Sequence, residues 1–292
     1  MAGKTRTAIG VAALCAIAAA RAQAPAIKVL MSGAFTAAFT ELAPEFERTA
    51  GSRIETRYGG SMGNSPDTIP NRLARGESAD VVILAAAALD DLIAHGRVVA
   101  GSRVDLARSS IGVAVRAGAP KPDISTVEAL KRTLLQAKSI AYSSSASGVY
   151  LSSELFPSLG IADQIAAKSR RVESGPVGEV VARGDAELGF QQISELRPVK
   201  GLDIVGPLPA GAQRVTVFSA GIVAGAKQPD AARRLIAFLS SAAAGPAIRK
   251  SGMDPVQKES SIGGVTATIQ THAPRYARRA PRISGGQGCS GL

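Results

Sequence analysis

The stretch that decides the fold is Asn71-Arg72-Leu73-Ala74-Arg75-Gly76-Glu77-Ser78-Ala79-Asp80-Val81-Val82-Ile83. Its first part belongs to a helical pattern over residues 68–75, and its end opens a continuous apolar run over residues 81–84. A short apolar run bounded by turn residues is typical of a buried strand. A second helical pattern covers residues 86–94, so this region is expected to form helix, strand and helix of an α/β layer.

The same alternation of strand-like and helix-like segments runs through the chain from residue 27 to residue 251. A helix is expected at 34–50, because Phe35, Phe39, Leu42 and Phe46 recur at the spacing of one helical face. The remaining expected strands are 27–31, 53–58, 111–116, 139–142, 187–190 and 214–224, and the remaining helices are 127–137, 147–159, 177–183, 231–239 and 243–251. This order is that of a parallel α/β protein.

We therefore interpret the fold class as α/β, with two Rossmann-like lobes, two crossover segments and a ligand cleft between the lobes. No internal repeat or low-complexity linker interrupts the body, which favours two crossovers over a single tether. Residues 23–108 plus 213–256 are expected to form lobe 1, and residues 109–212 lobe 2. Residues 257–292 lose periodicity and are rich in Gly, Ser, Pro and Arg, which predicts a disordered basic tail.

The first residues have the pattern of a cleavable signal peptide. Lys4 and Arg6 precede an apolar run over residues 8–20, and Ala20 and Ala22 supply small residues before a cleavage site. The run is shorter than the roughly 20 apolar residues that a membrane span needs, so an anchor is disfavoured. Residues 1–22 are interpreted as a signal peptide, which predicts a periplasmic protein that does not span a membrane.

Charge and composition exclude several classes of function. Residues 1–22 supply three basic groups of the net charge of +11, and residues 257–292 supply a surplus of four, so the body is only mildly positive. The body has no basic run interleaved with aromatics, which speaks against nucleic-acid binding. The two histidines are far apart, and the mature chain keeps only Cys289, so no metal site, cofactor or thiol nucleophile is predicted.

The segments in this order resemble the periplasmic molybdate-binding protein family, part of the type II solute-binding proteins of ABC importers. The resemblance covers residues 27–256 and rests on three segments. These are the opening strand and turn, the segment quoted above, and Ala146-Ser147-Gly148-Val149-Tyr150 followed by Glu187-Leu188-Gly189. It implies a monomer that holds a small anion between its lobes and presents it to a membrane permease. In that family the anion is bound by helix N-termini and a few hydroxyls, a favourable environment for negative charge.

The resemblance places the ligand donors on three loops. Its first serine position falls on Ala34, which moves the hydroxyl to Ser32, and its tyrosine position falls on Gln192. Because an amide donates and accepts at once, a larger organic carboxylate becomes an alternative to molybdate. The candidate ligand-binding residues are Ser32, Gly33, Ala34, Ser61, Met62, Ser147, Gly148, Gln191 and Gln192. A plainer interpretation is that Ser32, Ser61 and Ser147 only cap helices.

Two functions remain open from the sequence. The first is a solute-binding protein that captures an oxyanion or organic carboxylate for an ABC importer. The second is an isomerase. The molybdate-binding family resembles isomerases that move a double bond in aconitate by proton transfer, so the resemblance also allows this activity. Such an isomerase needs a base, and Glu195 and Tyr150 are the candidates, with Glu154 also available. None of the segments that match the family's ligand loops carries an Arg or Lys to clamp a tricarboxylate, which favours the binding protein.

Overall fold

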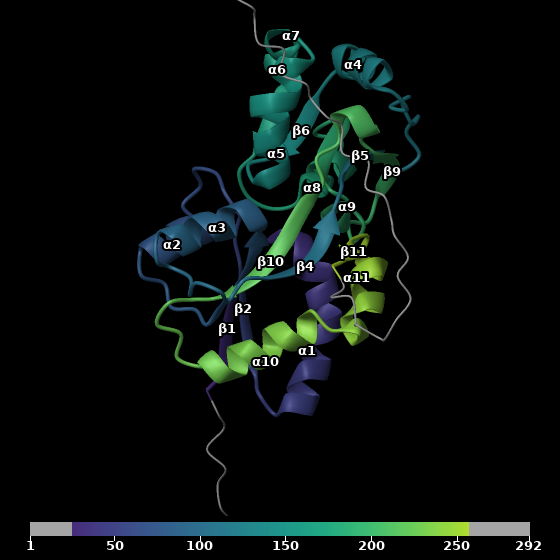
Figure 1. The fold of residues 1–292 in the computed structure, drawn as a ribbon. Helices are drawn as coiled ribbons and strands as arrows, with labels where there is room; N and C mark the ends of the chain where they lie inside the picture. Colours follow the sequence, from purple (N-terminus) through teal and green to yellow (C-terminus); the bar gives the residue numbers. More distant parts are fainter. Residues whose placement is uncertain (1–24, 257–292) are drawn as a thin grey trace, which may run out of the picture. The chain divides into compact units, whose positions relative to one another are not determined.

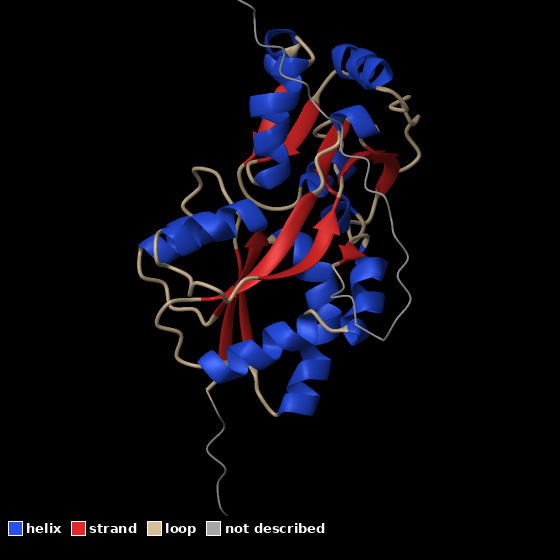
Figure 2. Cartoon of the chain, in the orientation of Figure 1, coloured by secondary structure: helices blue, strands red, loops and turns tan. Residues whose placement is uncertain are grey.

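The structure is a computed structural model that describes residues 25–256. It contains two β-sheets with helices packed against them (Figures 1 and 2). The first sheet has six strands in the order β11-β4-β10-β3-β1-β2. These strands are β1 (Ile27–Met31), β2 (Ile54–Tyr58), β3 (Val81–Ala85), β4 (Val104–Ser109), β10 (Thr216–Ile222) and β11 (Asp254–Pro255).

The second sheet has five strands in the order β7-β6-β8-β5-β9. They are β5 (Ile111–Arg116), β6 (Ile140–Ser143), β7 (Ser169–Val172), β8 (Leu188–Gln192) and β9 (Leu202–Pro207). The first sheet thus takes its strands from residues 27–109 and 216–255, and the second takes its strands from residues 111–207. The division into lobes of residues 23–108 plus 213–256 and of 109–212 stays a prediction.

Helices follow most strands. The longer ones are α1 (Thr36–Ala50), α3 (Ala86–Ala94), α4 (Val127–Gln136) and α10 (Pro229–Leu239). The shorter ones are the 3-10 turn η1 (Gly33–Phe35), α2 (Ile69–Ala74), α5 (Ala146–Tyr150), α6 (Phe156–Ser158), α7 (Ala162–Ala166), α8 (Val177–Ala182), α9 (Ile193–Leu196) and α11 (Gly245–Ser251). A π-helical turn, Leu151–Leu155, joins α5 to α6, so the expected helix at 147–159 is one helical segment of uneven pitch. Within residues 25–256 no helix is long and apolar enough to cross a membrane.

Each sheet has its own hydrophobic core. The predicted apolar face of α1 is confirmed, since Phe35, Phe39, Leu42 and Phe46 are buried in the cluster that also contains β1 and β3 side chains. A separate cluster around Ile111, Ile140 and Phe190 fills the second sheet. Burial of apolar side chains is the main stabilising term of such cores.

The order of elements predicts parallel strands, but both sheets are mixed. Strand β10 runs antiparallel to β3 and β4, and β5 runs antiparallel to β8 and β9. The chain passes from β4 to β5 through Ser110 alone, so no crossover helix sets the direction of β5. The sequence analysis also missed β4, β7 and β9, because residues such as Asp105 and Arg108 interrupt the apolar pattern that identifies a buried strand.

Two polar side chains, the buried Asp80 and the partly buried Gln213, join distant segments of the chain. Asp80 accepts hydrogen bonds from the backbone N–H of Lys28 (2.8 Å), Lys227 (2.7 Å) and Gln228 (2.9 Å), so it anchors the loop before α10 to the first sheet. Gln213 accepts from Ile111 N (2.9 Å) and donates to Ile111 O (2.9 Å), which joins the two segments that connect the sheets. The predicted signal peptide (1–22) and basic tail (257–292) lie outside the described residues.

Candidate functional site

A cavity of about 860 Å³ is lined by loops that follow strands of both sheets. From the first sheet come Ser32 and Gly33 after β1 and the loop from Gly59 after β2. From the second sheet come the loop from Ser143 after β6, and Gln191 at the end of β8. In open α/β sheets ligands gather at the carboxyl ends of strands, so this cavity, called the cleft below, is the candidate site.

Glu195 is the chemically unusual residue of the cleft. It lies on α9, directly after β8, and its Oε1 accepts a hydrogen bond from Gln191 Nε2 at 3.0 Å. Burial raises the pKa of Glu195 from its ordinary value of 4.5 to about 7, although hydrogen bonds from the Gln191 side chain and the Gln192 backbone act in the opposite direction. A carboxyl group with such a pKa exchanges a proton readily near neutral pH.

Gln191 fixes the position of that carboxyl group. Its Oε1 accepts from the backbone N–H of Val177 at 2.9 Å, at the N-terminus of α8. The amide orientation is therefore set, and Nε2 has to face Glu195. Because Gln191 is itself buried, it cannot swing away without leaving the Val177 N–H unsatisfied.

Gly33 makes room for the same carboxyl group. A Cβ atom at Gly33 would collide with Oε1 of Glu195, so the loop after β1 approaches α9 closely only because this residue has no side chain. Ser32 precedes it in an extended conformation without capping the following turn through its side chain. The Ser32 side chain is thus not a helix cap, and it lines the cleft.

Hydroxyl groups after β6 also line the cleft. Ser143, Ser144 and Ser145 line the cleft at the start of α5. Ser145 Oγ accepts from the backbone N–H of Ser61 at 2.9 Å, which links the loop after β2 to the second sheet. Hydroxyl groups of this kind can accept or donate, and so can bind either an anion or a protonated acid.

Four of the predicted site residues share the cleft: Ser32, Gly33, Gln191 and Glu195. Ala34 is buried against Ala85 and Phe218. Ser61 Oγ accepts from Ala85 N (3.0 Å), and Met62 packs against two hydrophobic clusters. The other three predicted ligand residues, Ser147, Gly148 and Gln192, are also outside the cleft lining.

Those three residues have structural contacts. Ser147 Oγ lies 3.0 Å from Ser143 Oγ, and Gly148 packs against the Ser143 carbonyl so closely that a Cβ would not fit. Gln192 is buried at the crossovers. In the amide orientation in which both the nitrogen and the oxygen are hydrogen-bonded, Gln192 Nε2 donates to Ser109 Oγ (2.8 Å) and Oε1 accepts from Thr216 Oγ1 (3.1 Å).

The structure does not bring Tyr150 together with Glu195. The Tyr150 hydroxyl donates to the Ala212 carbonyl at 3.0 Å, and the Arg214 guanidinium lies 4.3 Å from the centre of its ring. Glu154 forms an ion pair with Arg214. Burial raises the pKa of Tyr150, with Arg214 opposing and Glu154 adding to the shift. These three residues form a cluster outside the cleft lining.

The sequence analysis missed two arginines. Arg72 and Arg75 of the α2 region line the cleft, although the segments aligned with the family's ligand loops carry no cation. Both residues stand in the segment that identified the fold, and their spacing of three residues on a helix was the signal that puts them on one face. Arg72 holds the carboxylate of Glu77 at 2.7 Å and lowers the pKa of Glu77.

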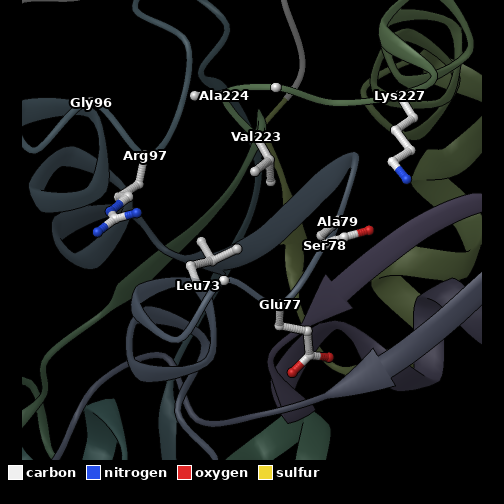
Figure 3. A pocket seen from close by; sticks show the side chains of 11 residues that line it. Leu73, Glu77, Ser78, Ala79, Gly96, Arg97, Val223, Ala224 and Lys227 are labelled. Atoms are coloured by element: carbon white, nitrogen blue, oxygen red, sulfur yellow. The ribbon is translucent and has the colours of Figure 1, made fainter.

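A second, smaller cavity of about 280 Å³ is lined by residues just before β3 and just after β10, away from the strand ends that line the cleft. Figure 3 shows Arg97 and Lys227 on opposite sides of it, with Glu77 at its edge. Glu77 is already engaged by Arg72, and all lining residues belong to the first sheet's part of the chain. Unlike the cleft, this cavity is therefore not lined by elements of both sheets.

Comparison with known proteins decides the family. Residues 27–254 match the family described as bacterial extracellular solute-binding protein. The chain belongs to this family. A relative named aconitate isomerase, from Pseudomonas sp, is 50% identical to this chain over 230 residues. The match covers 79% of this chain and 88% of the relative.

Solved structures of solute-binding proteins share the fold. The periplasmic molybdate-binding protein of Azotobacter vinelandii has a TM-score of 0.63 and 22% identity, over 78% of this chain and 98% of that one. The sulfate-binding protein of Mycobacterium tuberculosis H37Rv has a TM-score of 0.65 and 18% identity, over 79% and 87%. The predicted α/β fold class and the resemblance to type II solute-binding proteins are thus confirmed.

Glu195 predicts a pH dependence of stability in this solute-binding protein. Since the pKa rises from 4.5 in the unfolded chain to about 7 in the folded one, its contribution to stability falls as pH rises through this window. We expect Glu195→Gln to abolish this fall, which amounts to about 3 kcal/mol for the full shift. Urea unfolding of both proteins at pH 5 and pH 8 measures it. A difference between the two proteins that stays constant with pH would contradict the assignment.

The contact between Gly33 and Glu195 can be tested by a double-mutant cycle. Gly33→Ala is expected to push the carboxyl group off Gln191 and cost about 1 kcal/mol, the net value of one hydrogen bond. In a Glu195→Ala background the same change should cost little, because no carboxyl group is displaced. Gly60→Ala is the matched control, since a Cβ there would meet its neighbours at 3.4 Å or more. Equal costs of Gly33→Ala in both backgrounds would refute the contact.

Proposed function

We propose that this chain binds an unsaturated tricarboxylate in the cleft and isomerises it by proton transfer through Glu195, as an aconitate isomerase. The observation that carries the proposal is a carboxyl group with a pKa of about 7 at the wall of a large cleft. The relative named aconitate isomerase supports it, because the 50% identity extends over most of both chains.

The proposed reaction is a shift of one proton along three carbons. The Glu195 carboxylate takes a proton from the methylene group beside the double bond, and the electron pair of that C–H bond delocalises over the three-carbon unit. The same carboxyl group then returns the proton to the former vinylic carbon. The double bond moves, no electron is gained or lost, and Glu195 ends in its starting state. A base of pKa near the working pH is suited to both half-steps.

The walls of the cleft suit the intermediate of this reaction. A delocalised carbanion next to carboxylates carries negative charge that donors can stabilise in a site that excludes bulk water. Ser32, Ser143 and Ser145 supply hydroxyl groups, and Arg75 supplies positive charge, whereas the charge of Arg72 is balanced by Glu77. Gln191 holds Glu195 at one position, which favours transfer to both carbon atoms from one side of the ligand.

The second candidate is solute capture for an ABC importer, which membership of the solute-binding family favours. In this case export to the periplasm, a monomeric protein and a permease partner would follow. The hydrogen bond from Ser61 N to Ser145 Oγ supports it, since it is a contact across the cleft that closure around a ligand would form. A raised pKa at Glu195 is not needed for capture alone.

The two candidates differ in the fate of carbon-bound hydrogen. The full chain, incubated with trans-aconitate in ²H₂O, is expected to form the cis isomer, with deuterium at the methylene carbon in the turnovers in which protonated Glu195 exchanges with solvent before it returns the proton. The rate is expected to rise with pH through about 7 as Glu195 loses its proton. Glu195→Gln is expected to lower kcat by roughly 100-fold or more, the usual contribution of a general base. Proton NMR of the product measures both.

Binding by the variant provides the control. Glu195→Gln should still bind the saturated analogue tricarballylate in calorimetry, because the change leaves the rest of the cleft in place. Binding of trans-aconitate without any isomerisation by the unaltered protein would refute the isomerase and leave solute capture. Full activity in Glu195→Gln would refute the role of Glu195.

A further inference from the structure

The side chain of Arg75 is unengaged in the cleft. Arg75 lines the cavity and is exposed, and within residues 25–256 its guanidinium forms no hydrogen bond and no ion pair. We infer that Arg75 binds a carboxylate group of the ligand and thereby selects polycarboxylates over compact oxyanions. This inference rests on the carboxylate ligand of the proposed function and names the residue that recognises it.

Arg72, the neighbouring cation, is already occupied. Its Nε and Nη2 donate to the two carboxylate oxygens of Glu77 at 2.7 Å each, and its Nη1 donates to the Tyr58 carbonyl at 2.6 Å. A ligand carboxylate would have to displace Glu77 to reach this fork. Arg75 can offer the same bidentate geometry without breaking any contact in the described structure.

The backbone of Arg75 is held in place. Thr68 caps the start of α2 by accepting from Asn71 N, and the Arg75 N–H donates to the Asn71 carbonyl at 3.1 Å. Gly76 then ends the helix with a φ of +81°, a conformation that favours glycine. A cation at the C-terminal end of a helix is also favoured by the helix dipole. The side chain thus starts from a fixed point on the cleft wall.

The charges of the cleft leave Arg75 available. The carboxylates that line the cleft are Asp67, Glu77, Glu173 and Glu195. Glu77 is held by Arg72, and Glu173 forms an ion pair with Arg171 at 2.7 Å. Asp67 also lines the cleft, but in the described residues it forms no ion pair with Arg75. A ligand carboxylate therefore meets a guanidinium that no protein carboxylate neutralises by contact.

The arrangement explains a preference for extended ligands. Arg75 comes from the first sheet's part of the chain, and Glu195 comes from α9 in the second sheet's part. A compact tetrahedral oxyanion has no second group to offer, whereas a tricarboxylate can place one carboxylate on Arg75 while its carbon chain faces Glu195. Charge-assisted hydrogen bonds of this kind are the stronger polar contacts of binding sites.

Calorimetric titration with tricarballylate, a tricarboxylate without a double bond to isomerise, tests the inference at fixed ionic strength. We expect Arg75→Ala to weaken binding by about 10- to 100-fold, as for loss of a hydrogen-bonded charge pair. Arg75→Lys should recover part of the loss, because it keeps the charge but not the fork. Arg53→Ala, an exposed arginine outside the cleft lining, is the matched control and should bind like the unaltered protein.

Selectivity gives the second measurement. Glutarate, which has one carboxylate fewer, should lose its affinity less strongly in Arg75→Ala than tricarballylate does. Unchanged tricarballylate binding in Arg75→Ala, or equal weakening by Arg53→Ala, would overturn the inference. Because tricarballylate does not react, these outcomes stand apart from the proposed function. A protein without isomerase activity whose tricarballylate binding depends on Arg75 would refute only the isomerase.

Discussion

The site depends on one constraint, the confinement of the Glu195 carboxyl group between the loop after β1 and the end of β8. Gly33 leaves space for Oε1, and Gln191, itself fixed by Val177 N, holds it at 3.0 Å. The surrounding protein replaces water around the carboxyl group and raises its pKa to about 7. The result is a group that is neutral often enough to admit an anion and ionised often enough to accept a proton.

The scaffold of the solute-binding family accounts for how these parts meet. The loops after β1 and β2 in the first sheet and after β6 and β8 in the second all end at the cleft. Gln192 and Gln213 join the two segments that connect the sheets, so the relation between Gly33 and Glu195 is set by crossovers and not by the cleft alone. Binding and catalysis would therefore require the same geometry. Catalysis additionally requires that the bound ligand place an acidic C–H bond next to Glu195.

The sequence predicted the helices and buried strands well, because their apolar periodicity reports burial directly, as for α1 and β3. It did not predict the antiparallel directions of β5 and β10; the chain enters β5 directly from β4 through Ser110. Of the site residues that it proposed, Ser32, Gly33, Gln191 and Glu195 line the cleft. It placed Gln192 at the ligand, where the structure buries it at the crossovers, because adjacent residues of a strand face opposite sides. The sequence could not predict which arginine of the cleft is left without an ion pair, because that depends on which side chain engages Glu77.

The measurement that tests this account most directly is the pKa of the Glu195 carboxyl group. In protein labelled with ¹³C at glutamate side-chain carboxyl groups, the signal that disappears in Glu195→Gln can be followed by NMR as a function of pH without ligand. The account predicts a titration midpoint near 7. A midpoint near the ordinary value of 4.5 would contradict it, because the carboxyl group would then be hydrated and not confined beside Gln191 as the structure shows.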